Sequence, residues 1–116
     1  MSSTTQRGNY YKAKTKKYYE DLGYTVQITE FMCGLSIPGR TVYRKIDIFG
    51  SDGISLNGTD IIFWNSKHCS TKDKNNINTQ IRDGKKEFAK YPFPKNVKLH
   101  LVMWEPRKKP YIIECN

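Results

Sequence analysis

Three polar residues stand at the two ends of an apolar segment in the middle of the chain. Asp52 opens the segment "DGISLNGTDIIFWNSK", and Asn65 and Lys67 close it. Its alternating residues predict a β-hairpin with a two-residue turn at Asn57-Gly58. Such a hairpin would bring Asp52 to the same sheet edge as Asn65 and Lys67, which are two positions apart and therefore share one face of their strand.

An acid, an amide and a lysine at one sheet edge are suited to metal-dependent cleavage of phosphodiesters. Mg²⁺ is held by one or two carboxylates together with water and phosphate oxygens, and a nearby lysine can orient the attacking water. We therefore expect Asp52 to anchor a metal, Asn65 to be a weaker oxygen ligand aided by the carbonyl of Ser66, and Lys67 to be catalytic. A lysine that ends an apolar strand often only reaches for solvent, so the role of Lys67 depends on its register with Asp52.

Hydrophobic spacing predicts the elements that must position these residues. Tyr11, Thr15, Tyr18 and Leu22 recur at helical intervals, which predicts a first helix that begins near residue 7, ends at Gly23 and has lysines on its other sides. The remaining pattern predicts strands at 24–31, 41–49, 96–106 and 110–115, a loop at 32–40, a mobile polar segment at 68–80 and a second helix at 76–92. The order predicts an α/β sandwich with a small mixed sheet.

Length and charge limit the classes of protein. A chain of 116 residues is expected to form one domain, spanning residues 1–116. Twenty Lys and Arg against eleven Asp and Glu give a net charge of +9, which favours a nucleic-acid partner. We expect no membrane span and no signal peptide, because no apolar run is long enough. The odd, widely spaced Cys33, Cys69 and Cys115 indicate neither disulfides nor a zinc site, which is typical of a cytoplasmic protein.

These residues give the chain a resemblance to the PD-(D/E)XK nuclease superfamily. In that family an Asp at a strand start is followed, after a short hairpin, by Glu or Gln, any residue and Lys. Asp52 and Asn65 are thirteen positions apart, a separation similar to that in archaeal Holliday junction resolvases. The stretches "RGNYY", "GYTVQ", "DIFGSDGI" and "LVMWEPR" resemble small phage and archaeal members over most of the chain.

The resemblance implies a fold and an activity. The fold would be a restriction-endonuclease-like αβββαβ core, with a small mixed central sheet flanked by helices. The activity would be that of a DNA endonuclease that uses Mg²⁺ or Mn²⁺ and water, with a preference for branched structures as in Holliday junction resolvases. Because a junction cutter needs two sites, a two-fold homodimer is the expected assembly.

Two positions depart from the family pattern. The family usually has Glu or Gln where this chain has Asn65, and it often has a first-helix carboxylate where this chain has Lys12. Glu20 could supply the missing oxygen, although a solvent-facing Glu is the simpler interpretation. Asp47 could support the metal or instead pair with a neighbouring basic residue. Gln80 resembles a position that orients a catalytic water, but it could equally be a surface residue of the second helix.

The basic residues are candidates for contacts with the nucleic-acid backbone. The expected contacts come from the first helix and from the polar segment before the second, and they are Arg7, Lys12, Lys14, Lys16, Lys17, Lys72 and Lys74. Two other functions remain open at this stage. The two departures would suit a DNA-binding protein that has lost catalysis on the same fold. The charge alone would also suit a basic RNA-binding protein.

Overall fold

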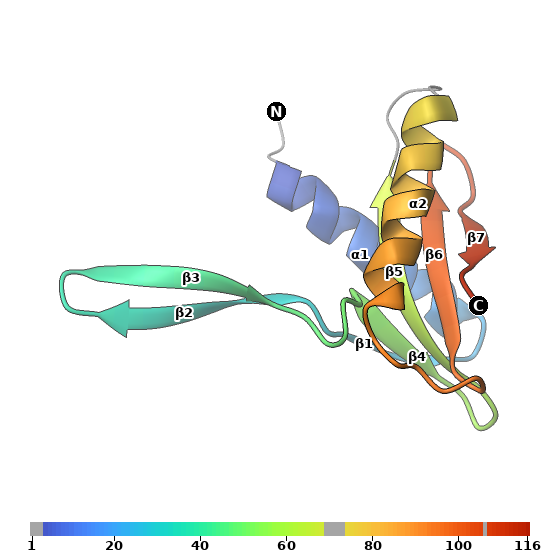
Figure 1. Ribbon diagram of the computed structural model, residues 1–116, viewed down its shortest axis with the longest axis horizontal. Coiled ribbons are helices and arrows are strands. Elements are labelled where there is room, and N and C mark those ends of the chain that lie inside the picture. The colour runs from blue at the N-terminus through green and yellow to red at the C-terminus, as the bar shows by residue number, and fades with distance from the viewer. Residues whose placement is uncertain (1–3, 69–73, 106) are drawn as a thin grey trace.

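The computed structural model describes residues 4–68, 74–105 and 107–116, which form two helices and seven strands (Figure 1). In chain order these are α1 (Thr4–Asp21), β1 (Thr25–Ile28), β2 (Phe31–Ile37), β3 (Arg40–Ile46), β4 (Gly53–Leu56), β5 (Ile61–His68), α2 (Lys74–Ala89), β6 (Lys98–Trp104) and β7 (Tyr111–Glu114). Neither helix, over its described residues, is long and apolar enough to cross a membrane.

The body of the molecule is a five-stranded mixed sheet between the two helices. The strand order is β1-β4-β5-β6-β7, with β5 and β6 parallel and the other pairs antiparallel. Alternate residues of β5 face opposite layers: Trp64 packs with Tyr19 of α1, and Phe63 packs with Phe88 of α2. The predicted α/β class with a small mixed sheet is therefore confirmed.

Helix α1 buries a face slightly different from the predicted one. Thr15 and Tyr19 are its buried residues, whereas Leu22 is 59% exposed. The helix ends at Asp21 and the chain turns at Gly23, which has a φ of +95°, so Leu22 lies beyond the last helical turn. The buried Thr15 hydroxyl donates to the Tyr11 carbonyl at 2.7 Å and accepts from Trp104 Nε1 at 2.8 Å, so a polar group is satisfied inside this layer.

The segment predicted as a loop at 32–40 is a wrong expectation. Most of it forms β2, which pairs with β3 from Phe31↔Ile46 to Ile37↔Arg40. Pro38 and Gly39 occupy only the turn between these strands, where Gly39 has a φ of +86°. Strand β3 was expected in the central sheet, but it belongs to a separate two-stranded sheet. We call β2, β3 and their turn the arm, because they extend away from the body (Figure 1).

The predicted hairpin is present as β4 and β5, but its turn is longer than expected. Residues 57–60 form the connection, and the Asn57 side-chain oxygen accepts the N–H groups of Thr59 at 2.9 Å and Asp60 at 2.6 Å. Gly53 is required in β4 for another reason. A Cβ at this position would lie 2.1 Å from Trp64 Cζ2, because the Trp64 ring lies across the backbone there.

Helix α2 begins at Lys74, two residues before the predicted start. It connects the parallel strands β5 and β6. Position 84 in this helix requires glycine, because a Cβ there would lie only 2.7 Å from Leu101 Cδ2. Residues 74–80 thus belong to the helix and not to the predicted polar loop, while 69–73 lie outside the described residues.

Candidate active site

Asp52 is held by strands on both sides. Its N–H donates to the Trp64 carbonyl at 3.0 Å, and its own carbonyl accepts from Thr29 N at 2.9 Å. The side-chain oxygen of Asn65 also accepts from the Asp52 N–H, at 2.7 Å. The predicted meeting of residues 52 and 65 is therefore found, but Asn65, which is buried, bonds to the backbone of Asp52. Its amide oxygen braces the β4–β5 edge.

The carboxylate of Asp52 contacts Ser66. Asp52 Oδ2 accepts from the Ser66 backbone N–H at 2.9 Å and from its hydroxyl at 3.3 Å. Ser66 was expected to offer a backbone carbonyl to a metal, whereas its observed contribution is as a double donor to the acid. These bonds fix one oxygen of Asp52 at the edge of β5.

Glu30 lies beside Asp52, and sequence analysis did not identify it. The Glu30 carboxyl shares a hydrogen bond with that of Asp52, and Lys12 Nζ lies 2.5 Å from Glu30 Oε1. The Lys12 and Glu30 side chains are only 14% and 13% exposed. Two carboxyl groups and one ammonium group therefore meet in a partly enclosed position between α1, the end of β1 and the start of β4. We call Asp52, Glu30 and Lys12 the acid–lysine cluster.

The pairing of β1 with β4 places Glu30 here. Ile28 lies opposite Gly53, so the residues that follow Ile28 run past Asp52, and Glu30 N donates to the Asp52 carbonyl at 3.4 Å. One signal in the sequence could have indicated this residue. Glu30 is the acid near the end of the first predicted strand, 24–31, and an antiparallel pairing of that strand with the hairpin would have brought it to Asp52.

The cluster raises the pKa of Asp52 from 3.8 to about 7. Burial is the largest cause, and the hydrogen bond and negative charge of Glu30 act in the same direction. The Ser66 N–H and the Lys12 charge oppose them without cancelling them. The two acids therefore carry more negative charge than Lys12 neutralises, and the raised pKa of Asp52 favours its protonated form up to near neutral pH.

We expect this pKa to make stability depend on pH. Because the folded pKa lies above the unfolded one, the contribution of Asp52 is complete below about pH 4 and is lost as the pH rises through 7. Relative to Asp52→Asn, which imitates the protonated acid, the wild type should lose about 2–4 kcal/mol of unfolding free energy between pH 4 and 8. Urea unfolding in EDTA would measure this. Parallel pH curves for the two proteins would contradict the assigned pKa.

Lys67 and Gln80 lie at the C-terminal end of β5, the end at which Ser66 contacts Asp52. Lys67 is half-buried, and the structure shows neither a hydrogen bond nor an ion pair between it and Asp52. Gln80 on α2 donates from Nε2 to the His68 carbonyl at 3.3 Å, so it is more than a surface residue. Its Oε1 is buried and, within the described chain, has no hydrogen-bond donor. A water or ligand group that donates a hydrogen bond would satisfy this atom.

The two alternative acids lie elsewhere. Glu20 is exposed and eight residues after Lys12, which is about 12 Å along the helix. The structure therefore does not bring Glu20 to the acid–lysine cluster. Asp47 is exposed, and its Oδ1 accepts from Gly50 N at 3.2 Å, so it stabilises the turn before Asp52.

The lysines of α1 have different surroundings. Lys12 belongs to the acid–lysine cluster, and Lys14 Nζ lies 4.7 Å from the ring centre of Trp104 in a cation–π contact. Lys16 is half-buried and Lys17 is exposed, so Lys17 is the α1 lysine most open to a nucleic-acid backbone. The side chains of Arg7 and Lys74, and the whole of Lys72, lie outside what the structure describes.

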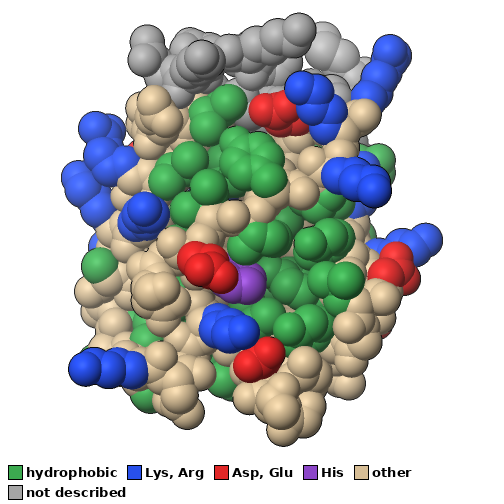
Figure 2. Space-filling view, turned by 90° about the vertical axis from the view of Figure 1, so that its right-hand side faces the viewer, with side chains coloured by type: hydrophobic (Ala, Val, Ile, Leu, Met, Phe, Trp, Pro, Cys, Tyr) green, Lys and Arg blue, Asp and Glu red, His purple; other side chains and the backbone are tan. Residues whose placement is uncertain are grey.

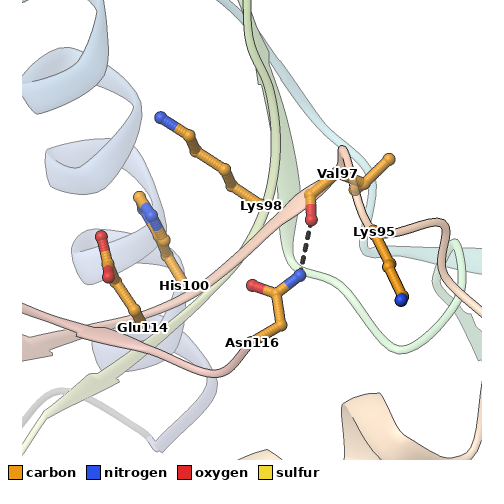
Figure 3. Close-up of a pocket in the computed structure, with 6 residues that line it drawn as sticks. All are labelled: Lys95, Val97, Lys98, His100, Glu114 and Asn116. Carbon is orange, nitrogen blue, oxygen red and sulfur yellow. Dashed lines mark hydrogen bonds between the residues drawn. The ribbon is translucent and has the colours of Figure 1, made fainter.

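A separate hollow lies beside β6 and β7 (Figure 3). Its volume is about 360 Å³, and it is lined by Lys95, Val97, Lys98, His100, Glu114 and Asn116. Its polar groups are partly used within the fold, since Asn116 Nδ2 donates to the Val97 carbonyl at 2.6 Å and Lys98 pairs with Asp60 at 3.4 Å. The hollow contains no residue of the acid–lysine cluster.

The face of the molecule opposite the arm differs from the candidate site. Figure 2 shows hydrophobic side chains gathered in the middle of this face, with Lys and Arg side chains mostly around the margin. Strand β7 forms the sheet edge on this side, and Ile112 and Ile113 are half-buried there. The positive charge on this face is therefore dispersed and does not form one basic patch.

Comparison with known proteins gives information on the fold alone. No protein-family model matches the chain, and no curated protein matches it significantly. The fold is similar to a solved protein, in the structure titled "Crystal structure of SSO0001", with a TM-score of 0.56 and 12% sequence identity. The similarity covers 99% of this chain and 53% of that one, so this chain spans about half of its structural neighbour. Together with the mixed sheet, this similarity supports the α/β class.

Proposed function

We propose that this protein is a metal-dependent DNA endonuclease of the PD-(D/E)XK type whose carboxylates are Asp52 and Glu30. The observation that carries the proposal is the acid–lysine cluster, in which two acids and a lysine meet in a partly enclosed space. The family motif most often combines these same three chemical groups, with Glu at a position that is sometimes Gln. In this chain Asn65 occupies the position where the family usually has a second acid. Glu30 would supply that carboxylate instead, and Lys12 or Lys67 would provide the amine.

The order of elements supports the same proposal. Without the arm, the chain runs through a helix, three strands, a helix and two strands. Asp52 lies at the start of the second of these three strands, as the resemblance implies. The net charge of +9 suits a DNA substrate, and the resemblance favours branched DNA and a two-fold dimer.

Mg²⁺ or Mn²⁺ fits the groups that are present. These ions need only one or two protein carboxylates, because waters and substrate phosphates complete their coordination. Two carboxyl groups face only one ammonium group, and a divalent cation would relieve this excess of negative charge, in line with the raised pKa of Asp52. Asp52 and Glu30 would hold the ion, which when bound supplies Lewis acidity and a more acidic water.

The residues of the chain would then have distinct tasks. Ser66 holds Asp52 in place through its N–H and hydroxyl, and Asn65 fixes the backbone of Asp52. A lysine ammonium beside the scissile phosphate would stabilise the negative charge that develops during hydrolysis. The buried Oε1 of Gln80, which has no hydrogen-bond partner among the described residues, is an acceptor available to a water molecule at the C-terminal end of β5.

A DNA-binding protein without catalysis is the second candidate. It is favoured by the ion pair between Lys12 and Glu30, which already places a cation on one of the two acids. The neutral Asn65 at the motif position supports it as well. The two candidates differ in whether a divalent ion can bind beside Lys12.

Cleavage and binding assays test the proposed function. We expect cleavage of four-way junction or duplex DNA in Mg²⁺ or Mn²⁺ and none in EDTA. We also expect binding to weaken by about 10³–10⁵-fold between 50 and 200 mM salt if six to ten phosphates are contacted. Salt-sensitive binding without cleavage would favour the second candidate. Binding to RNA but not to DNA would contradict both.

A further inference from the structure

The arm is a structural unit of its own. Strands β2 and β3 have seven residues each, and they pair with one another along their whole length. They form a sheet separate from the central one, and they point away from the body along the longest axis of the whole molecule, which is 46 Å in extent (Figure 1). A two-stranded ribbon is only marginally stable in water, so this arm would gain stability from a partner.

The residues of the arm indicate the chemistry of that partner. Residues 31–46 include Arg40, Arg44 and Lys45 and no acid. Large apolar side chains are also open to solvent, with Tyr43 at 67%, Ile37 at 42% and Val42 at 38% exposure. Tyr43 lies opposite Gly34, and a Cβ on that glycine would be 3.2 Å from Tyr43 Cε1, so the Tyr43 ring rests against the glycine. A positively charged ribbon without acids suits nucleic acid.

Charge argues against a second copy of the arm as the partner. Two copies would bring six positive charges and no negative ones together, and like charges along strand edges oppose pairing. A nucleic-acid backbone supplies the missing negative charge. The major groove of duplex DNA is about 12 Å wide and admits a two-stranded β-ribbon. Seven residues extend about 20 Å, which is long enough to follow the groove across several base pairs.

The base of the arm lies at the candidate active site. Glu30 directly precedes β2, and Asp52 follows β3 by six residues. The pair Phe31↔Ile46 closes the arm immediately beside these acids. If the arm lay in a DNA groove, the sugar–phosphate backbone at the border of that groove would therefore lie close to Glu30 and Asp52.

We propose that the arm is a groove-binding ribbon that inserts into the major groove of duplex DNA and places the adjacent phosphodiester at the acid–lysine cluster. This inference rests on the proposed function for its substrate. It extends that function by naming the element that holds the DNA and the groove that it enters.

Two sets of alanine substitutions test the arm against the rest of the surface. The arm variant replaces Arg40, Arg44 and Lys45, and the control replaces the exposed Lys85, Lys86 and Lys95, which changes the net charge equally. Each lost phosphate contact lowers affinity about eightfold at 0.1 M salt, so loss of two to three contacts predicts a reduction of about 50- to 500-fold. The control should lose less than tenfold. Equal losses in both variants would overturn the proposal.

Methylation by dimethyl sulfate identifies the groove. With the full-length protein on a mixed-sequence duplex, we expect protection at guanine N7, which lies in the major groove, and none at adenine N3. The arm variant should lose this protection at saturating protein. Protection at adenine N3 alone, or unchanged protection with the variant, would overturn the proposal.

An arm deletion separates this inference from the proposed function. A short glycine linker would replace residues 32–45, which leaves Glu30 and the central sheet in place. Circular dichroism and cooperative unfolding would check that the deletion variant still folds. If it does not fold, the methylation footprint of the alanine-substituted arm variant tests the proposal in its place. Lost DNA affinity with a retained monomer–dimer equilibrium supports a groove-binding arm, even if the wild type does not cleave DNA. Loss of dimerisation with unchanged DNA affinity would make the arm a contact between copies and would overturn the proposal.

Discussion

Asp52→Ala and Glu30→Gln should each reduce metal-dependent cleavage by more than about 100-fold. Loss of a residue that only supports a metal ligand typically costs 10–100-fold, and loss of a carboxylate that holds the ion should cost more. DNA affinity should stay within a few fold of the wild type, because both residues are acids beside a partly enclosed site. Single-turnover cleavage of a labelled junction, together with a binding titration in Ca²⁺, would measure both quantities.

Matched acids elsewhere provide the control for these substitutions. Asp47→Asn and Glu20→Gln remove one negative charge each from exposed positions outside the acid–lysine cluster. Both variants should cleave at nearly the wild-type rate. A strong loss with either one, combined with an active Glu30→Gln variant, would show that the ligands lie elsewhere. Cleavage that survives Asp52→Ala would exclude the whole site.

The central hairpin could be predicted from the sequence because the residue patterns that indicate it are local. Alternation on both sides of the 57–60 loop predicts β4 and β5, and the thirteen-residue interval predicts that residues 52 and 65 meet. The same reasoning failed for the arm, because Pro38 and Gly39 were interpreted as signs of a loop spanning nine residues. They form only a turn, and strands with exposed sides lack the strong apolar alternation of a buried sheet.

The acid–lysine cluster could not be predicted in the same way because it depends on long-range pairing. Glu30 reaches Asp52 only through the β1–β4 pair, and Lys12 reaches Glu30 only because α1 packs over this end of the sheet. The role of Asn65 depends on the direction of one side chain. Its residue type permits either a ligand or a backbone acceptor, and the structure shows the latter.

This difference changes which substitution should create a strong metal site. Asn65→Glu is a natural choice by the family pattern, but Asn65 already accepts the Asp52 N–H, and a longer side chain would disturb that bond. Lys12→Glu instead removes a cation from Glu30 and adds a third carboxylate beside the existing pair.

Lys12→Glu should raise Mg²⁺ affinity by about 100-fold or more. Two unit charges about 5 Å apart interact by roughly 3 kcal/mol at an effective dielectric constant near 20, and each 1.4 kcal/mol is tenfold. Lys12→Glu changes the charge by two units beside a doubly charged ion, so a gain of about 100-fold is a lower bound that allows for solvent screening. Without metal, the third acid should destabilise the fold, and added Mg²⁺ should recover the loss because binding to the folded state stabilises it. Calorimetric titration of EDTA-stripped protein and thermal melting with and without Mg²⁺ would measure both effects.

Lys17→Glu is the control for this change, because it alters the net charge identically from an exposed position on the same helix. It should leave Mg²⁺ affinity within a few fold of the wild type, since an exposed charge is screened by solvent and salt. Equal gains in both variants would mean that general electrostatics, and not the acid–lysine cluster, governs the ion. If Lys12→Glu gained affinity but not cleavage, the amine of Lys12 would be required for the reaction itself. If it gained both, Lys12 restrains an active site that otherwise needs only its two acids and the remaining lysine, Lys67.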